Sequence, residues 1–372
     1  MKIAIDLTSL YGRKRTGVEM YAIDLYKALL STGHKIVPIF HVENEIDSNP
    51  DAVIIERTFR LLLENTRLTK FIKRVDADMV IFPIFPPPLD IYGGRAKIVP
   101  VIHDLTFKKF RATQNFAAKY YYTPKTYVSL KHSDAIITIS ETVKKELFEV
   151  TTLPVFNCGE NISSEFAECL NNVSVEYLKK FDLERSKYII SVSTLEPRKN
   201  FKYLLKVIKP ILREKNMKLV LVGRKGWGKD KELLCLINDM SDIIVFTEYV
   251  THECLVSLYH YAHAFALLSI YEGFGRTPFE AVACGCQRII LSDIPIFRET
   301  FNNHALFLPL DAESSCISSL MDGSIPLVDR DFKIPFNVLE NRVPLFLKDI
   351  ECWQNRNCLL YTSPSPRDTE RS

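Results

Sequence analysis

The stretch Tyr271-Glu-Gly-Phe-Gly-Arg-Thr-Pro-Phe-Glu-Ala-Val-Ala283 holds two acidic residues, Glu272 and Glu280, at a junction between two predicted elements. The apolar run at 264–270 before it predicts a buried strand. The glycines after Glu272 predict a turn whose bare backbone lets a ligand approach closely, and Pro278 is placed to start a helix with Glu280 in its first turn. In an open α/β sheet, polar ligands bind beyond the carboxyl ends of the strands. These residues alone leave two interpretations open: a ligand site, or a turn in which Glu280 merely favours the helix dipole.

Short apolar runs alternate with helical patterns on both sides of this stretch. The strands predicted are 2–7, 35–40, 79–84, 97–102 and 135–139 in the first half, and 188–192, 218–222, 243–246, 264–270, 288–291 and 306–308 in the second. Residues 41–77 are expected to be polar and helical, and 293–299 to be a loop. This alternation predicts the α/β class, with parallel sheets covered by helices on both faces.

Composition limits the classes of protein that fit. The chain has 372 residues, enough for two domains, with 47% hydrophobic and 25% charged residues, as in soluble globular proteins. The net charge of +3 gives no argument for nucleic acid as a partner. No apolar run reaches the length of a membrane-spanning helix, and Met1 leads straight into a strand, so we expect a cytoplasmic protein.

Cysteine and histidine spacing gives no metal-binding pattern. All nine cysteines lie at or after Cys158, and none shows paired metal-ligand spacing. Cys284 and Cys286 are expected to be buried packing residues. The eight histidines form no H-x-x-x-H pair. We therefore expect no structural metal.

Polar residues follow several of the predicted strands. The basic loop from Gly12 to Gly17 precedes a predicted helix and suits an anion, or is a solvated turn. His103 ends a strand and either faces a crevice or is a core histidine. Arg198 and Lys199, at a strand-to-helix junction expected to be exposed, suit a diphosphate, or form a surface pair without a ligand.

One segment of the first half is both basic and aromatic. Residues 107–131 contain five lysines and an arginine (Lys108, Lys109, Arg111, Lys119, Lys125, Lys131) among the aromatic residues Phe110, Phe116 and Tyr120, Tyr121 and Tyr122. A surface of this kind can rest on anionic lipid headgroups. The alternative is a solvated face with its aromatic residues turned inward, and the aromatic residues do not share one helical stripe.

The glutamates at the opening stretch complete a recognisable pattern. Glu-Gly-Phe-Gly from Glu272, a second Glu eight positions later and Ala-x-Ala-x-Gly from Ala281 resemble the donor-site signature of the retaining glycosyltransferases of family 4. The resemblance spans roughly residues 1–321. It implies the GT-B fold: two doubly wound, Rossmann-like domains facing each other across a cleft. Arg276 and Thr277 stand where the family often has Leu-Pro, a departure that concerns selectivity.

The resemblance also implies roles for individual residues. Glu272 would meet the donor sugar, the Gly273-Phe274-Gly275 backbone its hydroxyls, and Glu280 the nucleotide ribose. The other residues implied at the donor site are His103 at the sugar, Arg198 and Lys199 at the diphosphate, Tyr249 and Val250 beside the base, and Gly17.

Domain boundaries follow from the same pattern. We expect an acceptor-binding domain over 1–160 and a nucleotide-sugar-binding domain over 161–335, joined through the polar segment 154–164. Relatives close with a helix that returns to the first domain, which 336–357 would supply despite Pro344. Residues 358–372 resemble the translated sequence of a sequencing-library adapter, or are a disordered Ser/Pro tail.

The function implied is sugar transfer. The pattern most resembles bacterial mannosyltransferases of surface-polysaccharide assembly, so GDP-mannose is the expected donor and a saccharide or lipid-linked saccharide the acceptor. Retention of configuration is implied by the family alone, and no metal or other cofactor is expected. The alternatives are a nucleotide-sugar epimerase of the same fold and a catalytically inactive nucleotide-binding scaffold.

Overall fold

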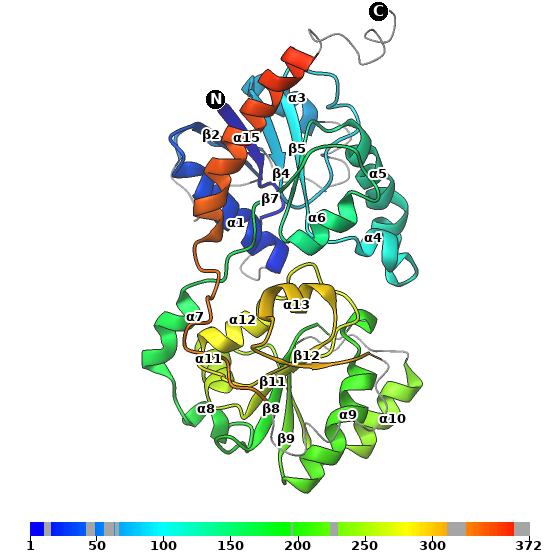
Figure 1. Ribbon diagram of the computed structural model, residues 1–372, viewed down its shortest axis with the longest axis vertical. Helices are drawn as coiled ribbons and strands as arrows, with labels where there is room; N and C mark the ends of the chain where they lie inside the picture. Colours follow the sequence, from blue (N-terminus) through cyan, green and yellow to red (C-terminus); the bar gives the residue numbers. More distant parts are fainter. Residues whose placement is uncertain are drawn as a thin grey trace, which may run out of the picture. The chain divides into compact units, whose positions relative to one another are not determined.

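The fold is described from a computed structural model of the chain. It describes residues 1–10, 16–41, 49–55, 63, 67–194, 196–223, 230–310 and 325–360, with backbone alone from 353 onward. The chain divides into two compact units (Figure 1): unit 1 comprises Met1–Asn161 and the chain from Asn337 onward, and unit 2 comprises Ile162–Phe336. Each unit is built on one parallel sheet with helices, so the predicted α/β class is confirmed.

Unit 1 has a seven-stranded sheet in the order β3-β2-β1-β4-β5-β6-β7. Its strands are β1 (Lys2–Asp6), β2 (Lys35–Phe40), β3 (Val53–Ile54), β4 (Met79–Phe82), β5 (Lys97–Ile102), β6 (Ile136–Thr138) and β7 (Val155–Asn157). Its α-helices are α1 (Gly17–Leu30), α3 (Leu68–Val75), α4 (Thr106–Lys109), α5 (Thr123–His132), α6 (Glu141–Leu147) and α15 (Val338–Leu360), with short turns at Arg111–Thr113 (3-10) and Ala118–Tyr122 (π).

The last described helix, α15, belongs to unit 1 and lies against α1 (Figure 1). Asn161 caps its start, because the side-chain oxygen accepts hydrogen bonds from the backbone N–H of Val338 (2.8 Å) and Leu339 (3.0 Å). Pro344 lies inside this helix and does not end it, contrary to the interruption that the sequence suggested. The described helix runs to Leu360, while the predicted tail beyond that residue lies outside the described residues.

Unit 2 has a six-stranded sheet in the order β10-β9-β8-β11-β12-β13. Its strands are β8 (Tyr188–Val192), β9 (Lys218–Val222), β10 (Ile244–Glu248), β11 (Ala264–Leu267), β12 (Ile289–Ser292) and β13 (Leu306–Leu308). Its α-helices are α7 (Glu165–Glu168), α8 (Glu176–Lys179), α9 (Phe201–Glu214), α10 (Lys231–Asp239), α11 (His252–His260), α12 (Arg276–Ala283) and α13 (Pro295–Phe301), with 3-10 turns at Cys169–Asn172 and Pro197–Lys199.

The unit 2 sheet is buried on both faces. Successive strand residues point to opposite sides, and helices cover each side. Ile190 and Val220 pack in a core with residues of α11 and α12, whereas Ile189 and Leu219 pack in a second core with residues of α9 and α10. Figure 1 shows these helix pairs on opposite faces of the sheet. Burying an aliphatic side chain of this kind contributes about 1.5–3 kcal/mol, which explains the nearly continuous apolar runs in the sequence.

Several local predictions were wrong. Residues 293–299 are not a loop, because α13 begins at Pro295 and buries Ile296 and Phe297. Strands β3 and β7 were missed, since each is too short to show periodicity and is held by a neighbouring strand. Helix α12 begins at Arg276, not at Pro278, so Glu280 lies one turn later than expected.

The strand order places two chain segments together in unit 2. Strands β8 and β11 are neighbours, and the order reverses between them, since β9 and β10 extend to one side and β12 and β13 to the other. The carboxyl ends of such a pair form the usual crevice for polar ligands in open α/β sheets. The segments that leave β8 and β11 are those with Arg198 and Lys199 and with Glu272.

Candidate active site

Glu272 is a buried carboxylate in the segment that follows β11. The residue is 6% exposed, and its Oε1 accepts a hydrogen bond from the Ser269 hydroxyl at 2.6 Å. Ser269 is itself anchored, because its backbone carbonyl accepts a hydrogen bond from the buried Ser292 hydroxyl at 2.6 Å. The carboxylate is therefore held in one orientation by the ends of two adjacent strands, β11 and β12.

Two cations from the end of β8 contact this carboxylate. Arg198 Nη1 lies 2.8 Å from Glu272 Oε2, and Lys199 Nζ lies 2.5 Å from Glu272 Oε1. The backbone carbonyl of Arg198 also accepts a hydrogen bond from Ile270 N–H at 2.8 Å, which ties the two segments together. The exposed Glu196 binds the other side of the guanidinium, with its Oε2 3.0 Å from Arg198 Nε.

The expectation that Arg198 and Lys199 occupy an exposed junction was wrong. Their side chains are only 24% and 12% exposed, because the 3-10 turn Pro197–Lys199 directs both toward Glu272. Asn200, with a φ of 53°, ends this turn and starts α9. The structure thus joins the three predicted residues into one charged cluster, which we call the Glu272 cluster.

The two cations decide the ionisation of Glu272. Burial by itself raises the pKa of the carboxyl, but the charges of Lys199 and Arg198 and the hydrogen bonds from Lys199 and Ser269 outweigh it, so the pKa is lowered. Glu272 is therefore ionised at neutral pH. An ionised carboxylate can accept hydrogen bonds and bind cations. It carries no proton at neutral pH, so it is not suited to act as a general acid.

Glu280, on the second turn of α12, has a different environment. Its side chain is 12% exposed; Arg276 Nε lies 3.8 Å from its Oε1, and the buried Tyr259 hydroxyl donates to its Oε2 at 3.4 Å. Burial raises the pKa of Glu280, and Arg276 and Tyr259 only partly oppose this. Burial also raises the pKa of Tyr259, which keeps the phenol neutral and able to donate.

Gly275 makes the turn between the two glutamates possible. Its φ is 89°, and a Cβ at this position would lie 2.5 Å from Cε1 of Phe297 on α13. Backbone in this region favours glycine, and the ring of Phe297 fills the space that a side chain would need. The helix that the sequence analysis missed therefore holds the glycine turn in place.

Tyr249 and Val250 lie apart from the Glu272 cluster in the sheet. They follow β10, which β9 and β8 separate from β11, and Tyr249 is 62% exposed. A β-bulge precedes them: Glu248 has a φ of 58°, and its carbonyl accepts a hydrogen bond from Gly223 N–H at 3.2 Å. The structure does not bring these two residues to Glu272, and their contact with a nucleotide base stays a prediction.

The remaining predicted residues belong to unit 1. His103 follows β5, and its Nε2–H donates a hydrogen bond to the Pro83 carbonyl at 2.8 Å. The ring of Tyr21 packs edge-on against the imidazole, with 4.8 Å between the ring centroids. Gly17 is exposed at the start of α1. The basic residues of the loop before it lie outside the described residues. Roles for His103 and Gly17 at a donor therefore stay predictions.

Three residues near the site were not predicted from sequence: Ser269, Tyr259 and Phe297. A serine at the end of an apolar strand is a weak signal for Ser269. Nothing local marks Tyr259 or Phe297, because each reaches its partner only through the fold.

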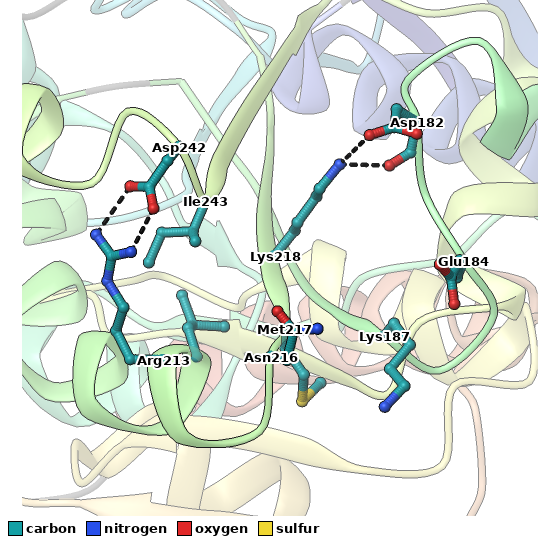
Figure 2. A pocket seen from close by; sticks show the side chains of 10 residues that line it. Asp182, Glu184, Lys187, Arg213, Asn216, Met217, Lys218, Asp242 and Ile243 are labelled. Carbon is teal, nitrogen blue, oxygen red and sulfur yellow. Dashed lines mark hydrogen bonds and ion pairs between the residues drawn. The ribbon is translucent and has the colours of Figure 1, made fainter.

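A polar pocket lies at the amino-terminal end of the unit 2 sheet, the end opposite to the Glu272 cluster (Figure 2). Lys218 binds Asp182, with 2.6 Å between Nζ and Oδ2, and Arg213 forms a two-pronged ion pair with Asp242. This pocket lies at the amino-terminal ends of β8, β9 and β10, whereas polar ligands of open α/β sheets bind at the carboxyl ends, so the Glu272 cluster is the better candidate site. Among the described residues no group of three His, Cys, Asp or Glu could hold a metal ion. No helix in the described part of the chain is long and apolar enough to cross a membrane.

Comparison with known proteins shows what the chain resembles. Residues 176–314 match the family described as glycosyl transferases group 1. The O-antigen chain mannosyltransferase RfbU of Salmonella typhimurium is 28% identical over 59% of this chain, and the match spans 58% of RfbU, less than two thirds of its length. The O-antigen chain mannosyltransferase B of Escherichia coli is 26% identical, over 83% of this chain and 88% of that protein.

Solved structures resemble the whole fold. Sucrose-phosphate synthase from Thermosynechococcus elongatus has a TM-score of 0.65 at 16% identity, covering 97% of this chain and 100% of that one. Anabaena HepE in complex with UDP and glucose has a TM-score of 0.60 at 14% identity, covering 98% and 100%. Both likenesses concern the fold alone. They show that the chain has the GT-B fold, and the family match lies in unit 2, which contains the Glu272 cluster.

Proposed function

We propose that the chain transfers a mannosyl group from GDP-mannose to a saccharide or lipid-linked saccharide acceptor, with retention of configuration. The mannosyl group is supported by the two bacterial relatives, which are both O-antigen chain mannosyltransferases. The guanine base and retention are supported only by the resemblance described from sequence. The complex of HepE with UDP and glucose makes UDP the alternative nucleotide to test.

One observation carries the reaction type: Arg198 and Lys199 converge on a buried acid at the carboxyl ends of β8 and β11. When the bond between sugar and nucleotide breaks, negative charge grows on the diphosphate that leaves. Two cations already held in place stabilise that charge without reorganising. Losing one such group typically costs about 3 kcal/mol of transition-state stabilisation, or roughly a hundredfold in rate.

Glu272 gives the cluster a second role. Its two oxygens hold the cations in position, and the lowered pKa keeps it ionised. In our proposal the donor diphosphate takes over contacts with Arg198 and Lys199, and the carboxylate then accepts hydrogen bonds from hydroxyls of the sugar. The cations thereby couple recognition of the sugar to recognition of the leaving group, without a metal or other cofactor.

Glu280 suits the ribose of the nucleotide. A vicinal diol donates two hydrogen bonds, and an acid with one cation at 3.8 Å has acceptor capacity left for them. Tyr259 fixes the orientation of this acid from its buried side. In this proposal Glu280 recognises the nucleotide and Glu272 the sugar.

The test is to incubate the protein with labelled GDP-mannose, UDP-glucose and UDP-galactose, with and without lipid-linked saccharide acceptors. We expect acceptor-dependent release of GDP from GDP-mannose, and a product whose anomeric configuration matches that of the donor. Release of UDP without release of GDP would show that the donor nucleotide is UDP. A product with the opposite anomeric configuration would show that the enzyme inverts. Conversion of the donor sugar to an isomer would indicate an epimerase, and binding without turnover a scaffold.

A further inference from the structure

The segment that runs from α4 to the end of α5 in unit 1 is strongly basic. Between Thr106 and Lys131 the sequence has six lysine or arginine residues and no aspartate or glutamate. The sequence left open whether its aromatic residues face a lipid surface or turn inward. The structure divides them into two groups.

The first group packs inside unit 1. Tyr122 stacks on Phe85 with 4.9 Å between ring centroids, and the Lys125 ammonium lies 4.9 Å from the centroid of the Tyr121 ring. Lys125 is only 4% exposed, an unusual position for a lysine that this ring contact accommodates. These residues hold the segment to the body of unit 1 and are not part of its surface.

The second group points away from the body. Phe116 is 80% exposed and Tyr120 is 56% exposed, and their rings contact each other at 4.9 Å between centroids. The Lys119 ammonium lies 5.4 Å from the centroid of the Tyr120 ring. We call Phe116, Lys119 and Tyr120, with the exposed Arg111 that precedes them in the chain, the aromatic tip.

The four cations from Lys108 to Lys119 also fall into two groups. Lys109 and Lys108 are paired with Glu146 and Glu149, at α6 and just after it. Within the described part of the chain, Arg111 and Lys119 make no ion pair with a carboxylate. The tip therefore combines two exposed rings with two cations that have no acid beside them.

We propose that the aromatic tip docks on an anionic lipid surface. An amphipathic ring is most stable at the boundary between headgroups and acyl chains, and arginine and lysine beside it meet lipid phosphates. Two free cations are few for a nucleic-acid footprint, which gains its affinity from many phosphate contacts. With two exposed rings, they suit a reversible contact with a membrane. This inference concerns unit 1 and does not depend on the proposed donor or on turnover.

The experiment is flotation of the full chain with two kinds of vesicle. One contains equal parts phosphatidylglycerol and phosphatidylcholine, and the other phosphatidylcholine alone. We expect binding to the anionic vesicles only, weakened by added salt. The double variant Phe116→Ser with Tyr120→Ser should bind at least tenfold more weakly. Removing a cation near an anionic surface costs about fivefold, so Arg111→Ala with Lys119→Ala should also lose more than tenfold.

Matched controls come from the same unit. Phe148 is 56% exposed but lies between Glu146 and Glu149, so Phe148→Ser removes an exposed ring outside the tip. Lys70→Ala with Lys73→Ala removes two exposed cations from α3. Both controls should bind vesicles like the unaltered protein. Melting temperatures of all variants show that each is folded, and Tyr120→Phe should retain binding.

Three results would overturn the proposal. The protein could bind neither vesicle, the tip variants could bind like the unaltered chain, or the α3 control could lose as much binding as the tip variants. If the tip bound a short single-stranded oligonucleotide more tightly than vesicles, the partner of the tip would be nucleic acid and not lipid. Vesicle binding that persists when no nucleotide sugar is turned over would leave this inference standing and remove the proposed function alone.

Discussion

Glu272 and Glu280 lie at the two ends of one strand-to-helix junction, yet their pKa values are shifted in opposite directions. Both are nearly buried, with side chains 8% and 12% exposed. The pKa of Glu272 is lowered and that of Glu280 is raised, although burial raises both. The difference comes from their partners. Glu272 contacts two cations at 2.8 and 2.5 Å, whereas Glu280 has one arginine at 3.8 Å and a phenol.

The comparison shows that burial alone does not set the charge of an acid at a strand end. What matters is whether the neighbouring strand delivers cations to it. Strand β8 is next to β11, and the segment after it supplies Arg198 and Lys199. Glu280 lies on α12, and its polar contacts in the described part of the chain are Tyr259 of α11 and Arg276 of α12. Pairs of acids whose pKa values are pushed apart are typical of sites where the two have different roles.

The largest effect should come from removing the cations that distinguish Glu272. Arg198→Ala and Lys199→Ala should each lower turnover about a hundredfold, because the growing charge of the leaving diphosphate loses a fixed partner. Both variants should also melt at lower temperature, since a buried carboxylate is left with one cation fewer. Steady-state kinetics and thermal melting measure the two effects.

The control for this prediction is Lys202→Ala. Lys202 lies on α9 just beyond the cluster, is 40% exposed and pairs with Asp230 and Glu232, so turnover should not change. Normal turnover in both cation variants would show that the Glu272 cluster is a structural ion pair only.

A smaller effect should separate the two acids by ligand. Glu280→Gln should weaken the binding of GDP about tenfold, as expected when a charged hydrogen bond to the ribose is lost. Glu272→Gln should leave GDP affinity intact and mainly impair use of the sugar donor. Calorimetry with GDP and kinetics with GDP-mannose test this, and the opposite pattern would mean that the two roles are exchanged.

Stability against pH should separate them again, by a smaller amount. The lowered pKa of Glu272 gives a stabilising contribution that is present above the unfolded value of about 4.3 and is lost as pH falls through the folded pKa. The raised pKa of Glu280 works the other way, because ionising it costs stability as pH rises above the unfolded value. Relative to the unaltered protein, Glu272→Gln should be destabilised at neutral pH and Glu280→Gln should not. The Glu280 difference should shrink as pH falls toward about 4.3, whereas the Glu272 difference should persist to that pH and shrink only below it. Melting temperatures measured across this range check the signs, and differences of the same sign for both would refute the contrast.

The smallest expected effect is none at all. If Arg198 and Lys199 neutralise the diphosphate, turnover should persist in a strong chelator. Loss of turnover that magnesium or manganese restores would mean that a metal does this work. The difference between the two acids would then be that Glu272 serves as a metal ligand and not as an anchor for two cations.

The sequence predicted the sheets and the residues of the Glu272 cluster because both depend on local patterns. The buried strands β2, β5, β8 and β9 were predicted with the bounds that the structure has, since continuous apolar runs are typical of parallel strands buried on both faces. The turn after β11 and the cations after β8 were candidates because polar residues at strand ends suit ligands, and the resemblance to family 4 glycosyltransferases favoured a ligand site over a surface turn.

The errors arose where distant contacts outweigh local preference. Helix α13 was taken for a loop because its seven residues are too few for a periodic pattern, and it is stabilised by the burial of Ile296, Phe297 and Phe301. Strands β3 and β7, at the two edges of the unit 1 sheet, exist because a partner strand supplies their hydrogen bonds. Burial of Lys199 could not be predicted either, since its partner is 73 residues away in the chain.

By itself, the sequence determined which residues of this protein carry charge and at which strand ends they occur, because strand periodicity and turn composition are local properties. Only the tertiary structure decided what those charges do. It placed Arg198 and Lys199 on Glu272 because β8 and β11 are hydrogen-bonded neighbours, and it left Glu280 with one distant cation. It likewise turned Phe116 and Tyr120 outward while packing Tyr122 on Phe85. Electrostatic and packing energies depend on distances through space, and the order of strands in a sheet, not the order of residues in the chain, sets those distances.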